Sequence, residues 1–400
     1  MKALKLSVAL LILCKSTLFC DDKLDSYISK NKKEQFDYDL KKNEAESSKL
    51  RDSWIAPLNL NYTNAKSNPY KEQQTSESTS VKMDQTVFQS GGIYYGIKFA
   101  EASKIYSNYS IDVAKRKLIK DAISLLMQIK QLELKISKQK LQIKNSEINL
   151  TQKKEGYLNG QLDSGFLDSA IVERNVMIQT LYDIETNKER VISKFHVLSD
   201  LDYESALIPN LSPITKEQFL EQNIVLGMSE SEIIKNGYAK DLRVTKYLPK
   251  VNVTAGYNWD ESDSTFQFGT NKKEYYNFGV KATLPIDINS FRDVESAKID
   301  YLKSKLVVAD VKKELNAIFE QVMQNIENLE RKKQLSIENR DIYEKLLSDT
   351  QDLFRAGYKT EYDLEMLQNS LEIHKSDIKI YEIDKDLELL TLYEMYKNEI

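Results

Sequence analysis

Chain breakers and cysteines are scarce in this sequence of 400 residues, which contains 12 glycines, 6 prolines and 2 cysteines. Because helix interiors tolerate few glycines and prolines, the composition favours long helices over a loop-rich globular domain. Both cysteines, Cys14 and Cys20, lie in an N-terminal stretch with a basic start and a short apolar run. This pattern predicts a signal peptide over residues 1–20, whose removal leaves no cysteine for disulfides or thiolate metal sites. Lipid attachment at Cys20 is the alternative, although Thr17-Leu18-Phe19 poorly matches the residues expected before a lipidated cysteine.

Long apolar runs, excess positive charge and catalytic motifs are also missing. No run of about 18 apolar residues follows the predicted signal peptide, which argues against a transmembrane helix. The net charge is −4, so the chain lacks the basic excess typical of proteins that bind nucleic acid. There is no glycine-rich phosphate loop, and the two histidines, His196 and His374, occupy non-equivalent places in polar helical stretches. We therefore expect neither an enzyme, nor a cofactor, nor a metal site.

Some stretches alternate apolar and polar residues with the period of a β-strand. They predict two hairpins with polar tips at 64–80 and 260–274, and their strands cover 54–63, 93–99, 247–259 and 276–284. Alternation alone also fits the half-buried sheet of a soluble protein. The strand lengths, the long tips, and the tyrosines and tryptophans at strand ends favour a membrane barrel. The residues expected on its lumen side are Lys98, Lys281, Asn252 and Thr254. The two lysines are interpreted either as ordinary polar lining or as the source of a weak preference for anions.

Four strands are too few to close a barrel, because the smallest membrane barrels have about eight. Open strand edges in lipid would leave backbone polar groups without hydrogen-bond partners. A membrane barrel must therefore be shared between copies of the chain. A dimer or a trimer would satisfy this requirement, and the residues do not choose between them.

Long coiled-coil helices follow each predicted hairpin. Apolar residues recur every seven positions, as in Ile129, Ile136 and Ile143 of the first half and Val308, Leu315 and Val322 of the second. A helix over 295–356 would extend about 90 Å, roughly three times the thickness of a bilayer core. The long helices end at Gly160 and Gly357, and return helices are expected at 166–198 and 361–398.

The two halves of the chain repeat each other in outline. Pro57 and Pro249 open strands, Gly96 and Gly279 fall within return strands, and Gly160 and Gly357 end helices. A period of about 190 residues is too long for a solenoid and indicates a duplicated half.

The predicted fold is a mixed α/β membrane protein whose shared barrel continues into a long helical coiled-coil barrel. Its expected parts are a signal peptide (1–20), an N-terminal periplasmic segment (21–53), the first β-hairpin (54–100), the first helical hairpin (101–198), a connecting segment and helix with a capping box at Thr215 and Gln218 (199–246), the second β-hairpin (247–288) and the second helical hairpin (289–400).

The turns between the paired helices carry the most specific residues. From Gly357 the chain reads GYKTEYDLEMLQNSL, with Thr360, Asp363 and Gln368 at three, six and eleven positions further on. From Gly160 it reads GQLDSGFLDSA, which keeps Asp163 but has Phe166 where an acid is expected. These tips, the strand opening YLPKVNVTAGY and the duplicated order resemble the TolC family of bacterial outer-membrane efflux ducts over essentially the whole mature chain.

The resemblance implies a homotrimer in the outer membrane, with a 12-stranded barrel in contact with lipid and a helical tunnel that crosses the periplasm. It implies that a periplasmic adaptor docks on the tips, at Gly160, Asp163, Gly357 and Thr360, and that an inner-membrane pump drives export of drugs or other small molecules. The duct of a type I protein secretion system is an alternative. A periplasmic coiled-coil structural protein is a further alternative, from a different class.

Acidic residues near the tips are candidates for a periplasmic gate. In a trimer, Asp363, Glu365 or Asp168 would form rings of carboxylates that attract cations if they faced the axis. Acids in the first turn of a helix are also favoured by the helix dipole alone. The sequence leaves both interpretations open for Asp363 and favours the dipole interpretation for the other two.

Overall fold

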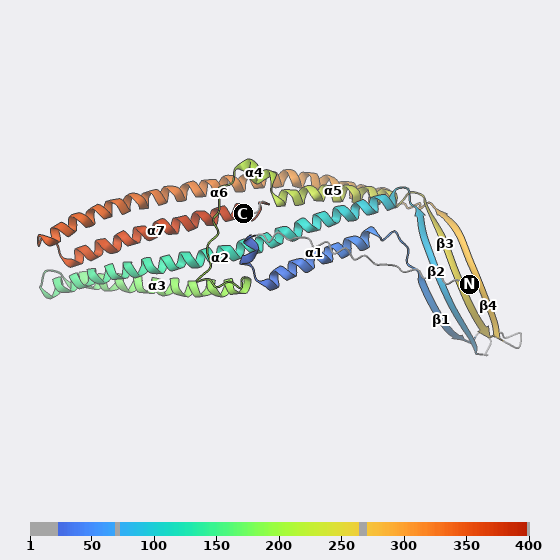
Figure 1. Cartoon of the computed structure of the whole chain (residues 1–400), viewed down its shortest axis with the longest axis horizontal. Helices are drawn as coiled ribbons and strands as arrows, with labels where there is room; N and C mark the ends of the chain where they lie inside the picture. The colour runs from blue at the N-terminus through green and yellow to red at the C-terminus, as the bar shows by residue number, and fades with distance from the viewer. Residues whose placement is uncertain (1–22, 69–72, 264–269, 398–400) are drawn as a thin grey trace, which may run out of the picture.

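The computed structural model describes residues 23–68, 73–263 and 270–397. The chain forms a long helical bundle with a four-stranded sheet projecting at an angle from one end (Figure 1). The predicted signal peptide, with Cys14 and Cys20, lies outside the described residues, as do the central parts of the hairpin tips. Within the described residues, no helix combines the length and apolarity needed to cross a membrane.

Two helical hairpins form the body of the bundle. The first pairs α2 (Gly92–Leu158) with α3 (Ser164–Leu198), and the second pairs α6 (Ser290–Arg355) with α7 (Glu361–Tyr393). At about 1.5 Å per residue, the 67 residues of α2 span about 100 Å. The return helices α3 and α7 cover only the half of the bundle that lies away from the sheet (Figure 1). In the other half, α1 (Lys30–Arg51) and α5 (Ile224–Thr245) lie along the long helices.

The sheet is antiparallel, with strand order β1-β2-β3-β4. Its strands are β1 (Asn59–Ser67), β2 (Gln74–Phe88), β3 (Lys250–Asp263) and β4 (Thr270–Thr283). The register aligns Leu60, Val81, Tyr257 and Tyr276 in one row across all four strands. Because side chains alternate between the faces of a strand, this row identifies the apolar face of the sheet. β1 and β4 form its two outer edges.

The prediction for the first hairpin was wrong in its return strand. Residues 93–99 lie in α2, and the returning strand is β2, of which only residues 74–80 fall within the predicted tip at 64–80. The chain turns from β2 into α2 through Ser90 and Gly91, both with positive φ. Residues 93–99 alternate in a way that fits a strand, but they continue without a break into the helix. β2 gave a weaker apolar signal because few of its residues are strongly apolar.

Three further predictions change with this correction. Lys98 lies on a helix and not on a barrel strand, and its ammonium pairs with Glu101 of the same helix at 2.8 Å. Gly96, in α2, is not equivalent to Gly279, in β4, so this pair of landmarks does not support a duplication. The second tip is also narrower than the predicted 260–274, because β3 and β4 extend into it. Pro57 and Pro249 do precede β1 and β3, as expected.

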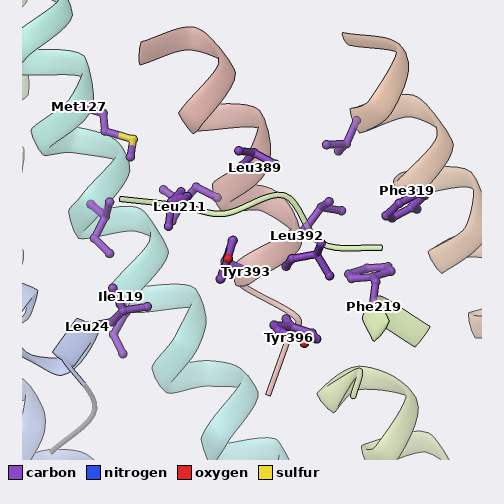
Figure 2. Close-up of a cluster of buried hydrophobic side chains, with 14 of the residues drawn as sticks. Leu24, Ile119, Met127, Leu211, Phe219, Phe319, Leu389, Leu392, Tyr393 and Tyr396 are labelled. Atoms are coloured by element: carbon purple, nitrogen blue, oxygen red, sulfur yellow. The ribbon is translucent and has the colours of Figure 1, made fainter. Parts of the chain in front are cut away.

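The largest core cluster lies at the middle of the bundle, where the connecting segment and the C-terminal end of the chain meet the long helices (Figure 2). Phe219 of α4 (Lys216–Glu221) packs against Phe319 of α6 with ring centroids 5.7 Å apart. The predicted capping box of Thr215 and Gln218 is confirmed and starts α4. Arg116 of α2 donates to the carbonyl oxygen of Tyr396 at 2.6 Å. These contacts connect the two hairpins at the middle of the bundle.

Candidate functional site

The sheet exposes its apolar face, whereas the buried side chains at its centre are polar ones on the opposite face. Leu60 is 73% exposed and Phe278 is 81% exposed, whereas Ser80 and Asn258 on the opposite face are each 5% exposed. A sheet that packs on a soluble core has the reverse arrangement, with its apolar side chains buried. Other exposed members of the apolar face are Tyr62, Val253, Tyr257, Trp259, Tyr276 and Val280.

On the polar face, side chains form hydrogen bonds to groups of the neighbouring strands. The amide of Asn252 donates to Asp84 at 2.9 Å, and its oxygen accepts from the Thr86 hydroxyl at 3.2 Å. Thr254 donates to the carbonyl oxygen of Gly279 at 3.3 Å. Lys281 pairs with Asn252 in the register, so three of the four predicted lumen residues share this face. That the face lines a lumen stays a prediction.

Sequence reasoning missed the part of this face that β2 supplies. Lys82 and Asp84 lie on the same face as Asn252, because Asp84 is opposite Thr254 and Lys82 is opposite Gly256. A Cβ added at Gly256 would come within 2.6 Å of Asn277 Oδ1, which shows how closely the polar side chains pack. The signal in the sequence was the alternation of Thr79, Val81 and Met83 with polar neighbours.

The tips of both helical hairpins lie together at the end of the molecule farthest from the sheet (Figure 1). Gly160 and Gly357 have φ angles of 68° and 81°, a left-handed conformation that glycine adopts without steric cost. A Cβ added at either glycine would meet no atom within 4 Å. Both turns therefore present bare backbone on the surface of the single chain.

Each tip places a capping side chain three residues after its glycine. Asp163 accepts backbone hydrogen bonds from Gly165 at 2.8 Å and from Phe166 at 3.3 Å, and so begins α3. Thr360 begins α7 through a reciprocal capping box with Asp363. The predicted tip residues thus occupy matching places in the two hairpins, with different chemistry.

The gate candidates have different surroundings in the chain. The Asp363 carboxylate accepts hydrogen bonds from the Thr360 backbone at 3.0 Å and from its hydroxyl at 2.9 Å, and these bonds lower the pKa of Asp363 below its usual range. The helix-capping interpretation therefore describes its contacts within one chain. Glu365 and Asp168 are exposed near the starts of α7 and α3. Whether any of the three faces a pore stays a prediction.

A ladder of polar pairs, which sequence reasoning also missed, joins the two hairpins between α2 and α7. Gln131 donates to Asp384 at 2.5 Å, Lys138 to Asp377 at 2.6 Å, and Asn145 accepts from Asn369 at 2.8 Å. The α2 members are spaced by seven residues, so they form one stripe along the helix. Their spacing was visible in the sequence, but their partners depend on how the hairpins pack.

Comparisons with known proteins agree with this architecture. The family model described as "Outer membrane efflux protein" matches residues 217–395, from α4 to the end of α7. The Campylobacter jejuni CmeC outer membrane channel superposes with a TM-score of 0.72 at 13% identity, covering 94% of this chain and 86% of that chain. The outer membrane protein VceC of Vibrio cholerae gives a TM-score of 0.69 at 12% identity, covering 91% and 93%. A comparison with curated protein sequences gives no match.

The Neisseria gonorrhoeae MtrE outer membrane channel is a third similar structure, with a TM-score of 0.66 at 11% identity, covering 93% of this chain and 86% of that chain. The chain therefore has the fold of these outer-membrane channels. Together with the match over residues 217–395, this fold confirms the resemblance to the TolC-like family of outer-membrane efflux proteins.

Proposed function

We propose that this protein is the outer-membrane duct of a tripartite efflux pump and that it works as a homotrimer. The observation that carries the proposal is the bare apolar face of the sheet, with Phe278 and Leu60 near its opposite edges. Lipid could cover that face without leaving polar groups unsatisfied. The hydrogen-bonded polar face would line an aqueous lumen.

Closure of the barrel sets the number of copies. With four antiparallel strands per chain, β4 of one copy can pair with β1 of the next, and no edge remains open. Two copies would give a barrel of about eight strands, whose interior is filled by side chains. Three copies are the smallest number that gives a barrel with a wider interior than this, so we favour a trimer.

The helices would carry the duct away from the membrane. The long helices extend about 100 Å from the sheet, and the tips at their far end present the bare turns at Gly160 and Gly357. We propose that a periplasmic adaptor docks at these turns and connects the duct to an inner-membrane pump. Asp163 and Thr360 would hold the turns in the docking shape by capping the return helices. The pump would supply the energy, and the duct would conduct small molecules passively.

The proposal is tested by deleting the gene in its own host and by locating and sizing the protein. We expect the deletion to raise susceptibility to exported compounds, and the protein to fractionate with the outer membrane as a detergent-stable trimer. Purified protein should conduct ions in planar bilayers. Recovery from the periplasm as a soluble protein without detergent would overturn the proposal. Loss of a secreted polypeptide with unchanged drug susceptibility would replace efflux by protein secretion.

A further inference from the structure

We propose that the segment Leu284–Phe291, between β4 and α6, docks on the stretch Trp54–Leu58 of a second copy of this chain. The contact would form an apolar clasp across the seam between neighbouring subunits. This inference rests on the proposed function, because it takes β4 of one copy to lie beside β1 of the next.

The first observation is a group of exposed apolar side chains directly after the end of the sheet. β4 ends at Thr283, opposite Lys250. Beyond the strand, the sequence still alternates the apolar residues Leu284, Ile286 and Ile288 with Pro285, Asp287 and Asn289. Ile286 is 93% exposed, Ile288 92% and Phe291 85%. Among the large hydrophobic side chains of the described residues, these three are the most exposed.

The second observation is a matching apolar stretch at the opposite edge. Trp54, Ile55 and Leu58, directly before β1, are 41%, 51% and 68% exposed. Gln85 of β2 fixes this stretch. Its side-chain oxygen accepts from the backbone of Ala56 at 2.9 Å, and its amide donates to the carbonyl oxygen of Trp54 at 3.0 Å. The acceptor surface is therefore already ordered within one chain.

Strand directions bring the two stretches together only between copies. Because neighbouring strands alternate in direction along the order β1-β2-β3-β4, β4 of one copy would run antiparallel to β1 of the next. The end of β4 then lies beside the start of β1, and Leu284–Phe291 lies beside Trp54–Leu58. Within one chain the same edges are about 14 Å apart, three strand spacings, which is too far for contact.

Charged groups next to the segment favour protein over lipid as its partner. Asp293, two residues after Phe291, accepts from the Tyr247 hydroxyl at 2.6 Å and pairs with Arg243 at 3.3 Å and Lys246 at 3.5 Å. Such a cluster belongs on the aqueous side of a membrane boundary. Apolar side chains at that level are better covered by a neighbouring subunit than by hydrocarbon.

Disulfide trapping in the full-length protein tests the clasp. The pair Leu58→Cys with Ile286→Cys should give covalent multimers when membranes are oxidised. A bond within one chain is excluded because bridged cysteines need Cα atoms within about 7 Å. The matched control is Val253→Cys with Ile286→Cys, because Val253 lies on the same apolar face but in the inner strand β3. Wild-type protein and the single variants control for the native cysteines.

Each outcome decides the inference. Multimers from the Leu58–Ile286 pair, with only wild-type levels from the control pair, support the clasp. A detergent-stable oligomer without these cross-links overturns the clasp and leaves the proposed duct intact, whereas a monomeric soluble protein overturns both. Quenching of a bimane label at Ile286→Cys by brominated lipid would place lipid at the segment and also overturn the clasp.

Discussion

The side-chain amide of Asn369, on α7, donates to Oδ1 of Asn145, on α2, at 2.8 Å. This bond lies at the tip end of the polar ladder between the hairpins, and Asn369 is only 7% exposed. A polar pair packed between two helices favours the register in which both side chains find their partner, because a buried amide without a partner is costly. The ladder thus sets how the two hairpins align.

Removing one partner of this pair should destabilise the protein more than removing both. In Asn369→Leu, the Asn145 side chain loses its buried partner, which costs about 1–3 kcal/mol. The double variant Asn145→Leu/Asn369→Leu should recover part of that loss. Thermal unfolding followed by circular dichroism, arranged as a double-mutant cycle, measures the coupling. Additive losses would show that the pair contributes nothing as a unit.

Bulk at Gly357 should block export without preventing assembly. The positive φ costs a β-branched residue about 1–2 kcal/mol, while the surrounding space is open in the single chain. We expect Gly357→Val to form trimers but to lose drug resistance. Gly357→Asn separates bulk from backbone strain, because asparagine tolerates the left-handed conformation and should also lose resistance if bulk is the cause. Full resistance in Gly357→Val would remove the docking role, and the same pair of variants at Gly160 tests the first tip.

Asp363 should make the tip sensitive to acid. Its pKa is lowered in the folded chain, mainly by the backbone hydrogen bond from Thr360, so it contributes stability above its unfolded pKa of about 3.9. That contribution is lost as the pH falls through the lower, folded pKa. Thermal stability should be measured from about pH 6 to about pH 3, a range that includes the unfolded pKa of about 3.9. Over this range it should fall more steeply in wild type than in Asp363→Asn. Equal slopes would contradict this assignment.

The same variant tests the gate. If Asp363 forms a ring at the pore, Asp363→Asn should change single-channel conductance or block by divalent cations in planar bilayers. Thr360→Val is the control, because it weakens the cap and keeps the charge. Unchanged currents in Asp363→Asn would leave Asp363 with helix capping as its role.

A charge on the bare face of the sheet should prevent membrane assembly. Leu60→Lys places a cation on the apolar face of β1, which costs about 2–4 kcal/mol at the centre of a bilayer. Asn61→Lys adds the same charge to the next residue, on the polar face, and should assemble normally. Outer-membrane fractionation compares the two variants. Equal yields would argue against lipid at this face.

Helix ends, capping boxes and strand faces could be predicted from the sequence, because the interactions that decide them lie within a few residues. Gly160 and Gly357 end helices because of their own backbone freedom, and Thr215 with Gln218 forms its capping box within four residues. The alternation in 251–257 and in 276–282 identifies the faces of β3 and β4 for the same reason. Each of these assignments needs only the sequence nearby.

The tertiary structure decided the rest, because those features depend on distant partners. Residues 93–99 alternate like a strand, yet packing makes them helical: Ser47 of α1 donates to the carbonyl oxygen of Ala100 at 3.2 Å, and Gly96 faces Leu242 of α5. The polar ladder joins residues more than 200 positions apart, so its partners exist only once the hairpins have aligned. The sequence by itself determined caps, turns and faces, and long-range packing determined which stretch became helix and which polar side chains meet.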